Sequence, residues 1–171
     1  DRGAAQQLTE QLMPKIHAHA YYRLGNITDA EDVTQEAFLR LWKVAPKWKQ
    51  DKAQVSTWLY RVVSNLCKDR HRRATLEEIV SVQEPTNESQ SPTSKIEDQL
   101  RQKALYTAMS TLPNSQRLAV QLRHIDELSN PQIAEIMELS IEAVESLTAR
   151  GKRKLTKILQ SHKSELGYSH G

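Results

Sequence analysis

The chain has 171 residues, with 24 Lys or Arg and 21 Asp or Glu, so its formal net charge is +3. This length is typical of one domain or of two small ones. No run of about 18 apolar residues occurs, which excludes a membrane-spanning helix. The single cysteine, Cys67, excludes an internal disulfide. The absence of a glycine-rich phosphate loop argues against the common nucleotide-binding enzymes.

The charges fall into three blocks. Residues 1–76 carry 13 Lys or Arg and 8 Asp or Glu, residues 77–98 carry one Lys and six acids, and residues 99–171 carry 10 Lys or Arg and 7 Asp or Glu. Two basic blocks separated by an acidic one indicate two surfaces for one polyanion. The mixed charge of solvated helices explains the same pattern equally well.

The first block reads as helix, because its apolar residues follow helical spacing. The predicted helices span residues 4–24, 29–44 and 55–73. Pro14 is expected to end one helix and open the next. Asp29 is expected to cap the second predicted helix, which Pro46 stops. The polar residues 47–54 predict a loop before the third helix.

Residues 82–93 (VQEPTNESQSPT) are polar, contain two prolines and have almost nothing to bury. This composition predicts an extended, flexible linker. The predicted domains are therefore residues 1–76 and residues 98–171, joined by an acidic linker over residues 77–97. Blocks of about 75 residues can each form only a small helical bundle.

The second block also reads as helix. The predicted helices span residues 94–111, 114–126, 129–137 and 140–161, and their expected first caps are Ser94, Asn114, Ser129 and Ser140. Ser94 and Ser129 are each followed three residues later by Glu or Gln, which is the spacing of a capping box. Strand signals are absent throughout. The predicted fold class is all-α, with two small helical bundles joined by a flexible acidic linker.

The last two predicted helices have the layout of a helix-turn-helix. Their apolar faces are expected to consist of Ile133, Ala134, Met137, Ile141, Val144, Thr148, Gly151, Leu155 and Ile158. The opposite face of the long helix is polar and basic, and it carries Ser146, Arg150, Arg153 and Lys157 with Lys152 and Lys154 beside them. Such a helix suits a DNA major groove, although a basic solvated helix gives the same pattern. Glu142 and Glu145 count against DNA, because carboxylates in the first turns repel phosphate.

Aromatic and basic residues gather in the first block. Five of the nine aromatic residues lie between residues 38 and 60, namely Phe38, Trp42, Trp48, Trp58 and Tyr60. The basic and polar residues that follow them are Arg61, Asn65, Lys68, Arg70, Arg72 and Arg73. Aromatic faces beside basic side chains can hold unstacked bases and their phosphates. Aromatic residues at helical spacing are also common in protein cores, and Phe38 and Trp42 are expected to be core residues.

Several segments together resemble a known family. LGN at 24–26, DAEDVTQEAFLRLW at 29–42, and TWLYR at 57–61 followed by Asn65 resemble the second conserved region of bacterial sigma factors. LP at 112–113, QR at 116–117, LS at 128–129, IAE at 133–135 and VES at 144–146, with Arg150 and Lys152, resemble the fourth region. Because only these two regions are present, joined by a short linker, the chain resembles an extracytoplasmic-function sigma factor.

The resemblance implies that the protein binds core RNA polymerase and makes it promoter-specific. The helix at 29–43 would bind the largest polymerase subunit, with Asp32, Gln35, Glu36 and Arg40 as its contacts. The loop at 47–56 and the following helix would capture flipped bases of the minus-ten element. The residues implied there are Trp58, Tyr60, Arg61, Asn65, Lys68, Arg70, Arg72 and Arg73. The helix at 140–157 would read the minus-thirty-five element through Ser146, Arg150, Lys152, Arg153 and Lys157.

The resemblance also implies promoter DNA as a partner, in duplex and melted form, and an anti-sigma factor that holds the protein inactive. The expected location is the bacterial cytoplasm, or the inner membrane through a membrane-bound anti-sigma factor, and the expected target genes are stress-response genes. Holding unstacked bases offsets an unpairing cost of a few kcal/mol per base, so strand opening can proceed without ATP.

The turn of the helix-turn-helix departs from the family pattern. The family usually has Gly where this chain has Glu138, and a positive φ at a non-glycine residue would cost about 1 kcal/mol. The recognition helix also has Glu145 and Leu147 where basic residues are common. The preferred minus-thirty-five sequence therefore cannot be transferred from the family.

No catalytic residues, cofactor or metal site are expected. His17 and His19 are two residues apart on a predicted helix, so they point to different faces, whereas helical metal ligands are three or four apart. The main alternative is a stand-alone helix-turn-helix regulator that binds duplex DNA as a dimer. A second alternative is a helical adaptor that binds protein alone. The segment 57–65 argues against both, because neither needs a stacking surface beside basic residues.

Overall fold

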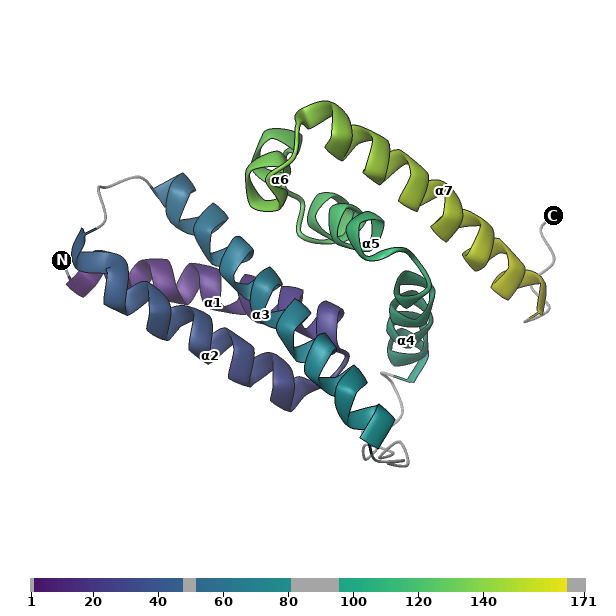
Figure 1. Cartoon of the computed structure of the whole chain (residues 1–171), viewed down its shortest axis with the longest axis horizontal. Helices are drawn as coiled ribbons and strands as arrows, with labels where there is room; N and C mark the ends of the chain where they lie inside the picture. The colour runs from purple at the N-terminus through teal and green to yellow at the C-terminus, as the bar shows by residue number, and fades with distance from the viewer. Residues whose placement is uncertain (1, 48–51, 81–95, 166–171) are drawn as a thin grey trace. The chain divides into compact units, whose positions relative to one another are not determined.

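The computed structural model describes residues 2–47, 52–80 and 96–165, and every regular element in these ranges is a helix (Figure 1). The elements are α1 (Arg2–Leu24), α2 (Ile27–Val44), the 3-10 turn η1 (Ala45–Lys47), α3 (Lys52–Val80), α4 (Ile96–Ser110), α5 (Asn114–Val120), the π-helical turn η2 (Gln121–Ile125), α6 (Asn130–Met137) and α7 (Ile141–Glu165). The predicted all-α fold class is confirmed. Two compact units are present, one built on α1–α3 and one on α4–α7.

The predicted acidic linker falls mostly on residues 81–95, which lie outside the described residues, as does Trp48. The two ends of the predicted linker are helical, because α3 continues past its predicted end at Arg73 to Val80 and α4 begins at Ile96.

The first unit is a three-helix bundle in which each helix packs against the other two. Its core contains Ile16, Phe38, Leu59, Val63 and Cys67, all 2% exposed or less. Two polar contacts join the helices at one end of the bundle. His71 Nε2 on α3 donates to the carbonyl oxygen of Arg23 near the end of α1 (2.6 Å). Arg70 on α3 donates to Asp29 Oδ1 on α2 (2.7 Å).

The helix α1 is continuous, so the prediction that Pro14 would end it was wrong. Proline removes one backbone hydrogen bond and crowds the preceding turn, which breaks isolated helices. Here Leu12 and Ile16 on either side of Pro14 are buried against the bundle. Packing of the flanking turns therefore keeps the helix in one piece, with Pro14 on its exposed side.

The first cap of α2 is Asn26 and not Asp29 as predicted. The Asn26 side-chain oxygen Oδ1 accepts the Asp29 backbone N–H at 3.0 Å. Gly25, with φ of 72°, provides the left-handed backbone that lets the chain reverse directly before this cap. Asp29 lies instead in the first turn, where its charge favours the helix dipole.

The second unit is built around a small apolar cluster. Met109, Leu112 and Val120 are buried, and Leu105, Ile125 and Leu155 pack against them. Asn114 is the first residue of α5 and not its cap, because Pro113 occupies the cap position. The predicted helix over 114–126 exists, but its last turn is widened to a π-helix, in which the Asp126 N–H bonds to the Gln121 carbonyl (2.9 Å).

A close contact between α5 and α7 occurs at Gly151, which is buried in the middle of α7. A Cβ at this position would lie 2.6 Å from Val120 Cγ2 and 3.3 Å from the Gln116 carbonyl oxygen. Glycine costs about 1 kcal/mol relative to alanine in a helix interior. The lack of space between α5 and α7, and not helix propensity, therefore explains why residue 151 is glycine.

Gly151→Ala is expected to lower the free energy of unfolding of the second unit by about 1–3 kcal/mol, because overpacking outweighs the gain in helix propensity. Denaturant unfolding of the full chain measures this change. Gln160→Ala, at an exposed position of the same helix, is the control and should leave stability unchanged or slightly higher. Equal stability of Gly151→Ala and the wild type would show that the contact is not tight.

Candidate nucleic-acid interface

The helix-turn-helix begins at a capping box that confirms the spacing in the sequence. The Ser129 hydroxyl accepts the Gln132 backbone N–H (3.4 Å), and the Gln132 side-chain oxygen accepts the Ser129 backbone N–H (3.0 Å). Pro131 lies in the first turn of α6, where its missing N–H is not needed. These contacts set the start of α6 and so the position of the turn that follows it.

The turn between α6 and α7 depends on Glu138, which has φ of 58° and ψ of 45°. Glu138 thus adopts a left-handed backbone at the position where the family usually has Gly. The backbone N–H groups of Glu138 and Leu139 both bond to the Ala134 carbonyl, which closes the end of α6. Ser140 then caps α7 as predicted, because its hydroxyl accepts the Ala143 N–H at 3.1 Å.

The buried face of α7 follows most of the predicted stripe. Val144 and Gly151 are buried, and Thr148, Leu155 and Ile158 are half-buried. Ile141 is the exception, since its side chain is 41% exposed. It lies in the first turn of α7, one turn before the packed stripe begins at Val144. On α6, Ile133 and Ile136 are buried, and Ile136 was missing from the prediction.

The predicted minus-thirty-five residues all lie exposed on α7. They are Ser146, Arg150, Lys152, Arg153 and Lys157, and Lys154 is exposed beside them. Glu142 and Glu145 are exposed as well. The structure therefore presents a helix with basic side chains along its outer surface and two carboxylates near its start.

A histidine lies close to this basic surface. The pKa of His124, in η2, is lowered by burial and then by the positive charges of Lys152 and Arg123. Arg123 itself donates to the Leu128 carbonyl (3.1 Å). The η2 turn thus places His124 close enough to Lys152 for that charge to act on it, and sequence reasoning had not placed it there.

The predicted minus-ten residues share α3 but differ in exposure. Trp58 and Arg61 are half-buried, and the exposed residues are Asn65, Lys68, Arg72 and Arg73. Tyr60 is 2% exposed, and its ring meets His19 edge-on with 5.4 Å between ring centres. A base contact by Tyr60 needs its ring at the surface, whereas the ring is buried in this structure.

Arg70, also expected to contact phosphate, is paired with α2. Its guanidinium donates to Asp29 (2.7 Å) and lies 3.6 Å from Asp32 Oδ2. This ion pair links α3, which carries the predicted DNA contacts, to α2, which carries the predicted polymerase contacts.

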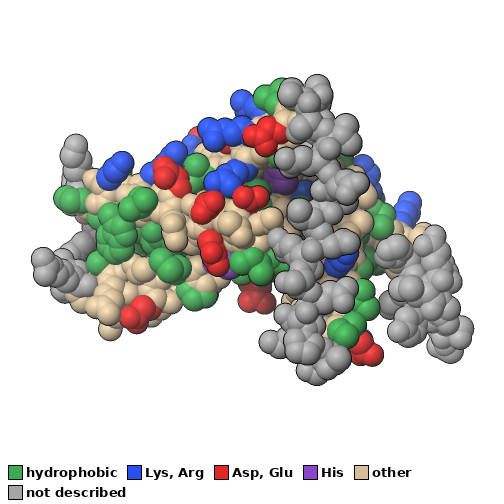
Figure 2. Space-filling view, turned by 90° about the horizontal axis from the view of Figure 1, so that it is seen from below, with side chains coloured by type: hydrophobic (Ala, Val, Ile, Leu, Met, Phe, Trp, Pro, Cys, Tyr) green, Lys and Arg blue, Asp and Glu red, His purple; other side chains and the backbone are tan. Residues whose placement is uncertain are grey.

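The predicted polymerase-binding residues lie on the outer face of α2. Asp32, Gln35, Glu36 and Arg40 are all exposed, and Arg40 Nε donates to Glu36 Oε1 (3.1 Å). Leu39 and Trp42 are also exposed, at 57% and 43%. On the face drawn in Figure 2, hydrophobic side chains gather toward the left, and acidic and basic side chains mix near the middle.

Phe38 is a core residue as predicted, but the core assignment of Trp42 was wrong. At about 100° per residue, Trp42 lies about 40° further around the helix than Phe38. The buried stripe of α2 is centred on Ala30, Ala37 and Leu41, so Trp42 falls beyond its edge. The spacing of the small and apolar residues of α2 is the signal in the sequence that places Trp42 outside the buried stripe.

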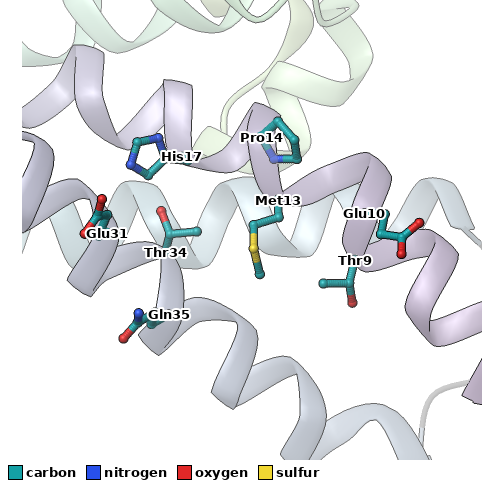
Figure 3. Close-up of a pocket in the computed structure, with 8 residues that line it drawn as sticks. All are labelled: Thr9, Glu10, Met13, Pro14, His17, Glu31, Thr34 and Gln35. Atoms are coloured by element: carbon teal, nitrogen blue, oxygen red, sulfur yellow. The ribbon is translucent and has the colours of Figure 1, made fainter.

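A shallow groove of about 470 Å³ lies between α1 and α2 beside the exposed face of α2 (Figure 3). It is lined by Thr9, Glu10, Met13, Pro14, His17, Glu31, Thr34 and Gln35. His17 borders this groove while His19 lies in the core, so the two histidines point to different faces as predicted. Among the described residues, no three potential metal ligands come together.

Comparison with known families finds a match in each of the two units. Residues 8–77 match the family Sigma-70 region 2, and residues 102–155 match Sigma-70, region 4. The chain is 30% identical over 171 residues to the ECF RNA polymerase sigma factor SigW of Bacillus subtilis, covering 94% of this chain and 91% of that protein. The chain belongs to the ECF family of RNA polymerase sigma factors.

Other relatives extend the comparison. The sigma factor is 29% identical to the ECF RNA polymerase sigma factor SigE of Mycolicibacterium smegmatis, over 95% of this chain and 64% of that protein. The solved structure of the sigma factor RpoE of Bartonella quintana has the same fold, with a TM-score of 0.70 and 19% identity over 92% of this chain and 97% of that one. The structure of CnrH also has a TM-score of 0.70, with 23% identity over 94% of this chain and 90% of that one.

Membership in the family sets the function. A sigma factor binds core RNA polymerase and directs it to promoters, so this protein acts in transcription initiation and its partners are core RNA polymerase and promoter DNA. The match to region 2 covers the first unit, which a stand-alone helix-turn-helix regulator does not need. That alternative is therefore not favoured. No helix among the described residues is long and apolar enough to span a membrane.

Glu138→Gly is expected to raise the free energy of unfolding of the sigma factor's second unit by about 1 kcal/mol, because glycine adopts a positive φ without the steric cost. Thermal unfolding of the full chain tests this. Glu135→Gly within α6 is the matched control and should lower stability by about 1 kcal/mol, because its backbone is helical. The same sign for both variants would contradict the assignment of strain to Glu138.

Acid is expected to destabilise the second unit through His124. Its pKa in the folded protein lies below the ordinary value of 6.5, so its contribution is complete above pH 6.5 and is lost as the pH falls through the folded value. Denaturant unfolding between about pH 7.5 and pH 5 measures the trend. His124→Gln should flatten it, and an unchanged slope in this variant would assign the trend to other groups.

Proposed function

We infer that this sigma factor opens the minus-ten element with α3 and reads the minus-thirty-five element with α7. The observation that carries the proposal is the arrangement on α3, where the half-buried Trp58 lies on the same helix as exposed basic side chains. A ring held at a surface can stack on an unpaired base while nearby cations neutralise its phosphates. A protein that binds only duplex DNA needs no surface for stacking on unpaired bases.

The residues on α3 divide into two groups. The proposed contacts to the melted strand are Trp58, Arg61, Asn65, Lys68, Arg72 and Arg73. Tyr60 and Arg70 are proposed to act beneath them, since Tyr60 is in the core and Arg70 is paired with Asp29. Arg70 can still add positive charge near the strand, because its side chain is 37% exposed.

The outer face of α2 is proposed to bind core RNA polymerase. Asp32, Gln35, Glu36 and Arg40 supply polar contacts, and the exposed Leu39 and Trp42 supply the apolar area that charged residues alone lack. Protein interfaces commonly combine an aromatic anchor with a polar rim. The two exposed apolar side chains therefore strengthen the assignment that the resemblance alone had suggested.

The exposed face of α7 is proposed to enter the major groove of the minus-thirty-five element. Its contacts are Ser146, Arg150, Lys152, Arg153 and Lys157. Glu142 and Glu145 near the start of α7 can accept from cytosine amines, which turns an unfavourable charge into base selectivity. The domain assignment proposed with this reading is region 2 at residues 1–76, a linker at 77–97 and region 4 at 98–171.

Regulation by an anti-sigma factor is proposed from the solved structures. The Bartonella quintana sigma factor was solved with the anti-sigma factor NepR, and CnrH was solved with the cytosolic domain of CnrY. The same kind of partner is proposed here, for control of stress-response genes. The protein is proposed to work in the cytoplasm, directly or through a membrane-bound anti-sigma factor, and to have no catalytic activity of its own.

The experiment that tests the function is run-off transcription on fragmented genomic DNA, with purified core RNA polymerase and with or without this protein. We expect discrete start sites that depend on the protein, and the upstream sequences define both promoter elements. Failure to produce them, with core polymerase that is active with another sigma factor, would contradict the proposal.

Trp58→Ala is expected to impair strand opening more than closed-complex formation, by about 1–3 kcal/mol for each base that loses its stacking partner. Permanganate reactivity of unpaired thymines on a promoter from the run-off experiment measures opening. Trp42→Ala is the matched control, because it removes the same side chain from α2 and should weaken polymerase binding instead. Equal losses in both steps and in folding stability would make Trp58 a core residue only.

A further inference from the structure

Arg70 lies on a different side of α3 from most of the residues proposed to contact the melted strand. At about 100° per residue, Trp58, Asn65 and Arg72 fall within about 40° of one another around the helix. Arg70 lies about 120° from Trp58 and about 160° from Arg72. Positive charge alone had grouped Arg70 with the DNA contacts, and its direction on the helix separates it from them.

The side of α3 that carries Arg70 packs against the rest of the bundle. Leu59 and Val63 lie about 20° on either side of Arg70 around the helix, and both are 0% exposed. The Arg70 guanidinium extends to the first two turns of α2, where it donates to Asp29 Oδ1 (2.7 Å) and lies 3.6 Å from Asp32 Oδ2. Arg70 therefore faces α2 and not the surface proposed to hold the strand.

Arg70 meets the two carboxylates with two different nitrogens. Nη1 bonds to Asp29, and Nη2 is the nitrogen nearest to Asp32. The guanidinium is planar, so its nitrogens present donors in fixed directions. Arg70 can add positive charge near a DNA strand, but this cluster has two negative charges for one positive charge. The attraction that Arg70 offers a phosphate is therefore largely offset by the carboxylates beside it.

The outer face of α2 shows why an arginine is useful at this place. Asp32 and Glu36, both proposed to contact the polymerase, are four residues apart on one helix face, where like charges repel. Each has an arginine beside it, since Arg40 Nε lies 3.1 Å from Glu36 Oε1 and Arg70 Nη2 lies 3.6 Å from Asp32 Oδ2. The Asp32 side chain is 53% exposed. Because ordering an exposed side chain on binding costs conformational entropy, a neighbour that holds it in place favours binding.

We propose that Arg70 is a positioning residue of the polymerase-binding surface, which holds Asp32 in place for core RNA polymerase, and that it is not a DNA contact. Asp29 anchors Arg70 through the shorter of the two contacts. A carboxylate offers about four acceptor sites, so Asp32 can accept from Arg70 and from a basic group of the polymerase at once. The proposal rests on the proposed function, because it assumes that Asp32 contacts the polymerase.

The experiment measures two properties of each full-length variant. The first is its affinity for core RNA polymerase, from a titration of the fluorescently labelled chain. The second is strand opening by the saturated holoenzyme, from permanganate reactivity on a promoter located by run-off transcription. Arg70→Gln should lower the affinity for core polymerase about two- to fivefold, which is the effect of losing one exposed ion pair. Strand opening at saturation should be unchanged.

Arg72→Gln is the matched control, because Arg72 is an exposed arginine two residues further along the same helix. Its own ion pair, with Asp69 on α3, is long at 4.0 Å. This variant should impair strand opening and keep the wild-type affinity for core polymerase. Impaired opening by Arg70→Gln with unchanged core affinity would make Arg70 a strand contact and overturn the proposal.

A double-mutant cycle tests whether Arg70 acts through Asp32. Asp32→Asn should weaken core binding, and adding Arg70→Gln to it should cause no further loss. Multiplicative losses in the double variant would overturn the proposal. Wild-type core affinity in Asp32→Asn would instead contradict the proposed role of Asp32 in polymerase binding, as would the absence of any dependent start site in the run-off experiment.

Asp29→Asn separates positioning from folding stability. It removes the anchor of Arg70 and leaves the Asp32 carboxylate in place, so core affinity should fall as it does in Arg70→Gln. Thermal unfolding of each variant is followed as well, and core affinities are compared at a temperature where all variants are fully folded. Wild-type core affinity in Asp29→Asn would show that Asp32 does not need an anchored Arg70 and would overturn the proposal.

Discussion

The second unit depends on the close contact of Gly151 with Val120 and the backbone of α5. This contact sets the rotation of α7 about its own axis, because no larger residue fits between the two helices. Once the rotation is set, helical periodicity decides which side chains are exposed. The basic face and the carboxylates near the start of α7 both follow from that one orientation.

In the first unit, polar contacts position α3 against the other two helices. Arg70 joins α3 to α2 through Asp29, and His71 joins α3 to the end of α1. These two contacts fix the part of α3 that carries Arg70 and His71, and Trp58 lies more than three turns earlier on the same helix. The buried Tyr60, packed edge-on against His19, supports the same helix from below. A preorganised surface loses little conformational entropy when it captures a strand.

The elements that sequence reasoning predicted well are those with a local physical cause. The capping box at Ser129 and the cap at Ser140 are both decided by neighbours within a few residues. Errors arose where distant parts of the chain decide. Pro14 stays inside a helix because the turns on either side are packed, and Trp42 is exposed because the buried stripe of α2 is centred away from it.

The sequence by itself determined the all-α class, the helix-turn-helix and the membership in a sigma factor family. The reason is that helical periodicity, capping residues and motifs depend on residues that are close together in the chain. Only the tertiary structure decided which candidate residues reach the surface. It buried Tyr60, paired Arg70 with Asp29 and brought Gln116 of α5 beside the cations of α7. The physical reason is that such contacts join residues distant in the chain, and packing of helix against helix sets their distances.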